Sequence, residues 1–145
     1  MTPREMVVEL AARRQVLEWF VAVRTKSEMN ARDHWSKRKR RFDEQKAATW
    51  LEFRAKYPNS VRVQFIDRDW NRVPVVVTLT RHGRKLDSDN LQSALKAIRD
   101  TVAAILGIDD GDEDAATWIC RNGAVKSEGK EIVGVSVRIE PRAGG

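Results

Sequence analysis

The stretch that decides the fold is PVVVTLTRHGRKLDSDNLQSALKAIRDTVAAILG, residues 74–107. Its opening residues, 74–81, are apolar nearly throughout, which predicts a central β-strand. Apolar residues then recur three or four positions apart, as on one face of an α-helix. The residues of that face are Leu91, Ala94, Leu95, Ile98, Val102, Ile105 and Leu106. Asp89 is the expected N-cap, with Gln92 three residues on, and Gly107 stands where the helix should end. A strand, a short basic turn and an amphipathic helix are therefore predicted in succession.

The segments around this unit predict a second helix and further strands. A helix from about 41 to 56 has a rough apolar side made of Phe42, Ala47, Trp50, Leu51 and Phe53. The remaining expectations are a short helix over 4–13 and strands at 15–24, 61–66, 116–121 and 132–139. We therefore expect one α+β domain spanning 1–145, in which helices pack on a small mixed sheet of about four strands. Residues 1–13 and 141–145 are expected to be peripheral.

Composition limits the classes of function. A length of 145 residues suits one domain, and 27 Lys plus Arg against 21 Asp plus Glu give a net charge of +6, which favours an acidic partner without proving one. Cys120 is the single cysteine, so no disulfide within the chain is possible and a reducing cytoplasm is expected. One cysteine and two histidines exclude a Cys- or His-rich zinc site. No apolar run is long enough to cross a bilayer, and residues 1–5 lack the pattern of a signal peptide.

Two acidic clusters are candidate metal ligands. Residues 87–89 read Asp-Ser-Asp and residues 109–112 read Asp-Asp-Gly-Asp, and magnesium prefers oxygen ligands of this kind. The helix between them is about 25 Å long. The clusters can meet only if the loop after Gly107 folds back, or if a neighbouring strand carries Asp110 alongside the helix start. Helix capping, complementation of the helix dipole and a solvated turn explain the same residues without a metal.

Several of these segments occur together in one known family. They are residues 79–81, 84–91, 94–96, Asp100 and 106–110. Their order resembles the RusA-like Holliday junction resolvases, a family common in phages and prophages, whose pattern is D-x-D-N-L at a helix start, a lysine within that helix and D-D after it. Residues 27–30, followed by basic residues, also look like the family's early polar loop. The resemblance covers about residues 15–140 and is sharp over about 79–112.

The resemblance implies a mixed α/β fold, a homodimer and Mg²⁺-dependent hydrolysis of phosphodiesters near a four-way DNA junction, with Mn²⁺ as a substitute metal. The family's three essential aspartates map onto Asp87, Asp89 and Asp110, with Asp109 and Asp112 as alternates for the third. The family lysine lies four residues after the second aspartate, where this chain has Ser93. Lys96, seven residues after Asp89, is the nearest candidate for that catalytic role.

Basic residues on both sides of the acidic motif are expected to contact DNA phosphates. They are Arg32, Lys37, Arg38, Lys39, Arg40, Arg41, Arg81, Arg84 and Lys85. Trp35 is a candidate for stacking on an unpaired base, although packing in the core or at a dimer interface is favoured, as for Trp19, Trp50 and Trp118. Two other interpretations stay open, a non-catalytic nucleic-acid-binding module on a nuclease-like scaffold and a protein-interaction domain. Neither a membrane nor a small-molecule cofactor is expected as a partner.

Overall fold

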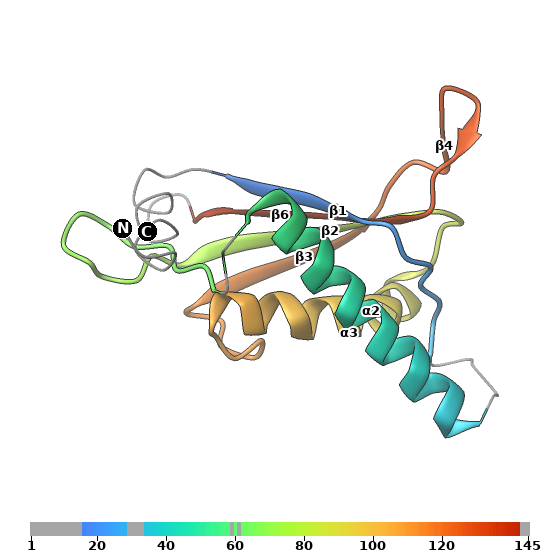
Figure 1. Ribbon diagram of the computed structural model, residues 1–145, viewed down its shortest axis with the longest axis horizontal. Helices are drawn as coiled ribbons and strands as arrows, with labels where there is room; N and C mark the ends of the chain where they lie inside the picture. The colour runs from blue at the N-terminus through green and yellow to red at the C-terminus, as the bar shows by residue number, and fades with distance from the viewer. Residues whose placement is uncertain (1–15, 29–33, 59, 61, 143–145) are drawn as a thin grey trace.

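A mixed four-stranded sheet carries two long helices on one of its faces (Figure 1). The structure, a computed structural model, describes residues 16–28, 34–58, 60 and 62–142. The elements in chain order are β1 (Leu17–Val21), α2 (Trp35–Lys56), β2 (Val75–His82), α3 (Ser88–Leu106), β3 (Ala116–Asn122), β4 (Lys126–Ser127), β5 (Lys130–Glu131) and β6 (Gly134–Pro141). The predicted α+β class and the size of the sheet are confirmed.

The order of strands in the sheet is β1-β6-β2-β3. β2 runs parallel to β3 and antiparallel to β6, and β6 pairs antiparallel with β1. The predicted central position of β2 is therefore confirmed. Two parallel neighbours require a crossover connection, and α3 supplies it. The turn from β2 into α3 consequently lies at the carboxyl end of an interior strand.

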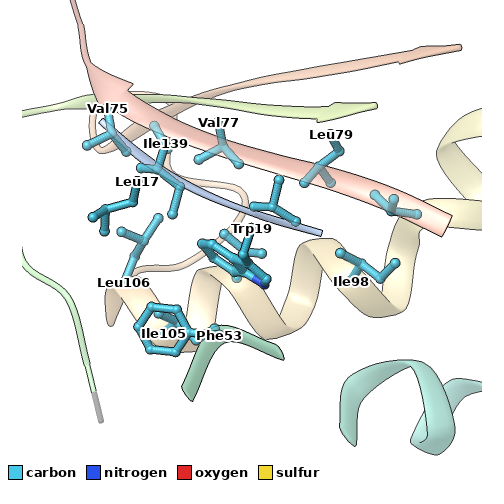
Figure 2. Close-up of a cluster of buried hydrophobic side chains, with 14 of the residues drawn as sticks. Leu17, Trp19, Phe53, Val75, Val77, Leu79, Ile98, Ile105, Leu106 and Ile139 are labelled. Carbon is cyan, nitrogen blue, oxygen red and sulfur yellow. The ribbon is translucent and has the colours of Figure 1, made fainter. Parts of the chain in front are cut away.

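Alternate residues of the strands and the apolar face of α3 form one hydrophobic core, shown in Figure 2. Every residue predicted for the apolar face of α3 is buried. In β2, Val77 and Leu79 are fully buried beneath the helices. Phe53 of α2 is also fully buried and lies 5.0 Å, between ring centroids, from Trp19 of β1. This contact joins α2 to the sheet, and it confirms the expected core position of Trp19.

The helix expected at 41–56 is longer than the sequence suggested. α2 begins at Trp35, with His34 as N-cap, so the basic run 37–41 is helical. Lysine and arginine favour helices, and their like charges are tolerated because residues 37–40 face solvent and Arg41 is paired with Glu28. The predicted apolar side was also wrong in part, because Ala47 and Leu51 are exposed. The buried residues of α2 are Gln45, Thr49 and Phe53.

The strand predicted at 61–66 is wrong for the residues that the structure describes there. Residues 62–65 form no ladder, and Ile66 makes one isolated bridge with Arg72. The backbone N–H of Val63 donates instead to the carbonyl of Ile105 in α3, at 2.9 Å, and the carbonyl of Phe65 accepts from Val73. Val63 and Phe65 are buried, so this segment is an extended loop whose apolar side chains pack in the core.

The predictions for the two ends of the chain can be compared with the structure only in part. The helix predicted at 4–13 and the tail at 143–145 lie outside the described residues. Pro141 is not peripheral, because it ends β6 and pairs with Val75. The short β4–β5 ribbon was not predicted, and it projects from the sheet in Figure 1. Among the helices described, none is long and apolar enough to span a membrane.

Candidate functional site

The N-cap of α3 is Asp87 and not Asp89, which corrects the prediction by two residues. The Asp87 carboxylate accepts hydrogen bonds from the Asn90 backbone N–H at 2.9 Å and from its side-chain Nδ2 at 3.0 Å. These bonds, the backbone one first, lower the pKa of Asp87. Asn90 stands three residues after the cap and donates both bonds to it, so the cap is one-sided and is not the capping box expected of Asp89 and Gln92. Asp89 therefore falls in the first turn, exposed to solvent.

A loop from β1 is fastened to the start of α3. The Ser27 hydroxyl donates to the side-chain carbonyl of Asn90. The Glu28 backbone N–H donates to Ser93 Oγ at 3.0 Å, and the Glu28 carboxylate accepts two hydrogen bonds from Arg41, at 2.7 and 3.0 Å. Ser93 thus bonds to this loop at the position where the family has its lysine. Through Glu28, the basic start of α2 is tied to the beginning of α3.

Hydrogen bonds to the loop after β1 and to β3 hold the turn between β2 and α3. Arg81 donates to the hydroxyl and the carbonyl of Thr25, at 2.8 and 2.9 Å, and to the carbonyl of Arg84 at 2.6 Å. Partial burial lowers the pKa of Arg81. The side-chain amide of Asn122 on β3 bonds both the N–H and the carbonyl of Leu86. Arg81, predicted to bind DNA, therefore uses its donors within the chain to hold this turn.

The chain folds back after α3, which is one of the two conditions for the acidic clusters to meet (Figure 1). Gly107 ends the helix in the left-handed conformation, with φ 67°, as predicted. The carbonyl of Asp110 then accepts a hydrogen bond from Arg99 Nη2 at 3.0 Å, and the Asp110 carboxylate lies 3.4 Å from Arg99 Nε. Arg99 is eight residues before Gly107, so the turn carrying Asp110 reaches well back along the helix.

An open hollow of about 430 Å³ runs along this side of α3. It is lined by Asp89, Gln92, Ser93, Lys96, Arg99 and Asp110. Two of the predicted metal ligands therefore face the same space as the predicted lysine. Lys96 is largely exposed and lies 3.6 Å from Asp100, one turn further along the helix.

The complete set of three carboxylates is not brought together. In the part of the chain that the structure describes, no group of three or more His, Cys, Asp or Glu side chains is arranged to hold a metal ion. Asp87 caps the helix, and the alternates Asp109 and Asp112 accept backbone hydrogen bonds within their own turns. Magnesium often binds through one or two carboxylates, with water and substrate phosphates completing its shell. Asp89 and Asp110 are the two carboxylates that line the hollow.

Sequence reasoning missed Gln92 and Arg99 as lining residues. The signal that identifies them is a polar stripe at positions 89, 92, 93, 96 and 99, whose spacing of three or four residues is that of one helix face. The apolar face of the same helix gives the stronger pattern. Cys120, on the neighbouring β3, is a poor candidate ligand because burial raises the pKa of its thiol.

The other predicted DNA-binding residues fall in two exposed places. Residues 37–40 are exposed on the first turns of α2, which project away from the sheet in Figure 1. Arg84 and Lys85 are exposed in the turn just before Asp87. Arg41 is committed to Glu28, and Arg32 lies outside the described residues.

Trp35 does not pack in the core of the protomer, which was one of the two places expected for it, and a position at a dimer interface stays a prediction. Its exposed fraction is 67%, and it lies at the solvent-facing start of α2. Trp50 and Trp118, in contrast, pack against the core as expected. His34 accepts a hydrogen bond from the Ser36 backbone N–H at 3.2 Å, which makes it a capping residue.

Two substitutions at Asp87 test its role as the cap of α3. We expect Asp87→Ala to lower the melting temperature by a few degrees, because it removes the acceptor for the first turn of α3, whereas Asp87→Asn keeps an acceptor and the stability. Because the folded-state pKa of Asp87 is lowered, its stabilising effect is present at neutral pH and is lost as pH falls below about 4. Thermal unfolding followed by circular dichroism at pH 7 and pH 3 measures both effects. A melting temperature for Asp87→Ala equal to that of the unaltered chain at pH 7 would show that the cap is dispensable.

No protein-family model, curated protein or solved structure matches the chain. The assignment of function therefore depends on the chemistry of the site itself.

Proposed function

We propose that this protein is a Mg²⁺-dependent endonuclease that cuts branched DNA, such as a four-way junction, by hydrolysing phosphodiester bonds. One observation carries the proposal. Asp89 lies in the first turn of a 19-residue helix and Asp110 lies beyond its end, yet they line one open hollow together with Lys96 and Arg99. Carboxylates and cations side by side in an accessible hollow suit a reaction on a phosphate.

Each of these side chains has a defined task in such a reaction. Hydrolysis of a phosphodiester needs an activated water and neutralisation of the charge that develops on the phosphate oxygens. A bound Mg²⁺ would supply a more acidic water and Lewis-acid stabilisation. Asp89 and Asp110 offer the hard oxygen ligands for that ion. Lys96, exposed at the hollow, balances the charge of the phosphate group.

The exposed basic residues bind the phosphates of the DNA. Residues 37–40 extend from the body of the molecule on α2, and the contact between Arg41 and Glu28 places this helix next to the start of α3. Phosphate contacts of this kind bind without reading sequence, which suits recognition of a branch by its shape. The exposed ring of Trp35 offers a surface on which an unpaired base can stack. Matched cuts in two strands require two sites, which a homodimer with twofold symmetry provides.

The first test is cleavage of a synthetic four-way junction in Mg²⁺ and in EDTA, beside linear duplexes made from the same arms. We expect paired nicks that require Mg²⁺ and spare the linear DNA. Tight junction binding without cutting in Mg²⁺ or Mn²⁺ would refute the nuclease and support a non-catalytic binding module. The dispersed ligand set and Ser93 favour that second candidate. Weak junction affinity with no preference for branched over linear DNA would instead support a protein-interaction domain.

A further inference from the structure

We propose that Trp70 is a nucleic-acid contact, an aromatic side chain on which an unpaired base of single-stranded or branched DNA stacks. The inference rests on the DNA binding of the proposed function, and it needs neither the metal nor the cleavage. Trp70 lies in the loop between Ile66 and Arg72, just before β2. In Figure 1 this green loop projects at the left end of the molecule, away from the first turns of α2.

Residues 68–70 form a three-residue hairpin loop with an ordered backbone. The Asp67 N–H donates to the Asn71 carbonyl at 2.9 Å, and the Trp70 N–H donates to the Asp67 carbonyl at 3.1 Å. The Asp67 carboxylate also accepts from the backbone N–H groups of Asp69 and Asn71, at 2.9 and 3.0 Å. These bonds fix the conformation of the loop before any ligand binds.

The fold itself gives no reason for a tryptophan at position 70. The third residue of such a loop takes the left-handed conformation, for which glycine is the usual residue. Trp70 has φ 66°, a conformation that is unfavourable for a large aromatic residue. Its exposed fraction is 73%, the highest among the large hydrophobic residues that the structure describes, and it is not part of the core. The ring therefore adds little packing at a strained position, which is typical of a side chain that serves binding.

The basic residues around Trp70 suit the phosphates of a nucleotide. Arg68 and Arg72 lie two residues to either side of it in the sequence, and both are exposed. Arg72 Nη1 donates to the Gly107 carbonyl at 3.3 Å, and the exposed side chain of Arg62 lies against the same glycine. Arginine contacts phosphates while an aromatic ring stacks on the base, so the two kinds of side chain recognise different parts of one nucleotide.

An isolated ring among polar residues suits a single base better than a protein surface. A stable protein interface buries about 800 Å² on each partner around an apolar centre. The neighbours of Trp70 in the loop are instead exposed and charged or polar: Asp67, Arg68, Asp69, Asn71 and Arg72. A base needs only the face of one ring, and stacking does not depend on which base is present.

The experiment measures binding of the full chain to a labelled oligothymidylate in EDTA by fluorescence anisotropy. Trp70→Gly removes the ring and suits the left-handed backbone. It should weaken binding about 5- to 150-fold, the range for loss of one base-stacking aromatic residue, without lowering the melting temperature. Trp70→Tyr keeps an aromatic ring and should retain most of the affinity. The oligothymidylate should also quench the tryptophan fluorescence of the unaltered chain more than that of Trp70→Gly.

Two controls isolate the contribution of the ring. Glu128 is a second non-glycine residue in the left-handed conformation, with φ 52°, and it lies in the turn between β4 and β5. Glu128→Gly makes the same change of backbone preference without removing an aromatic ring, so it should leave DNA affinity unchanged. Asp69→Asn changes a charge next to Trp70 and keeps the ring, and it should bind like the unaltered chain.

Equal affinity of Trp70→Gly and the unaltered chain for oligothymidylate would overturn the proposal. If Trp70→Gly does not fold, Trp70→Asn decides in its place, because asparagine also tolerates the left-handed conformation. A dimer that Trp70→Gly dissociates, with unchanged DNA affinity, would assign the ring to an interface between copies and overturn the proposal. If the unaltered chain binds neither oligothymidylate nor a four-way junction, the proposed function fails together with this inference. If it binds and cuts junctions, but Trp70→Gly binds both DNAs equally well, only the role of Trp70 fails.

Discussion

Asp89→Asn is expected to abolish cleavage of a four-way junction while leaving junction binding unchanged or stronger. In the proposed reaction the substitution removes a ligand charge from the hollow, and loss of metal-based stabilisation worth several kcal/mol would lower the rate by about 10³-fold or more. Binding persists because one negative charge leaves a surface that accepts phosphates. Asp89 is exposed in the first turn and Asp87 is the cap, so the helix itself should stand.

Cleavage rates and junction affinity, the latter in EDTA, should be measured for Asp89→Asn beside Asp69→Asn. Asp69 is an exposed aspartate in the turn after Ile66, so it provides the same chemical change away from the hollow. The control should cut and bind like the unaltered protein. Loss of cutting and binding together, with a lower melting temperature, would mean that Asp89 serves the helix and not the chemistry.

Phe53→Ala is expected to lower the free energy of unfolding by about 3–5 kcal/mol, the range for a large aromatic side chain removed from a core. Phe53 is fully buried, and its ring centroid lies 5.0 Å from Trp19 and 5.6 Å from Tyr57. The ring is the main aromatic contact between α2 and the sheet. Because α2 also carries the exposed basic residues, the variant should lose junction affinity in proportion to its loss of structure.

The matched control lies two residues away. Leu51 on the same helix is 68% exposed, and Leu51→Ala should change the free energy of unfolding by less than about 0.5 kcal/mol. Urea unfolding at 25 °C gives both values. If the two variants lost similar stability, α2 would be packed on the sheet by a different face from the one described.

The sequence pattern was sufficient to predict a helix or strand wherever the residues of that element alone show which of its faces is buried. The apolar face of α3 is written at helical spacing, and each of its residues is buried as predicted. The same holds for the central strand β2, whose run of apolar residues marks burial, and for Gly107, whose left-handed conformation suits glycine. In these cases the residues that decide the structure lie close together in the sequence, so their spacing alone was enough to predict it.

The first residues of the two helices could not be predicted from the local sequence pattern alone. Asp87 and Asp89 are equally good caps by residue type, and the choice fell to Asp87 because Asn90 donates to it and the loop at Ser27 secures Asn90. The start of α2 was misplaced for a similar reason. Its first turns are charged and exposed, so they carry no apolar pattern to mark them, and the cap at His34 defines where they begin.

What the sequence by itself determined is the α+β class, the central strand, the buried face of α3 and the residue types from which a phosphate-handling site can be built. Only the tertiary structure decided which of those residues meet. Asp110 lines the same hollow as Asp89 because the chain folds back after Gly107 and the Asp110 carbonyl accepts a hydrogen bond from Arg99. The Arg99 side chain in turn lies over the ring of Trp118 on β3. Asp87, Asp109 and Asp112 are instead committed to local hydrogen bonds. The physical reason is that periodicity reports burial along one element, whereas a site is made by contacts between elements that no spacing in the sequence encodes.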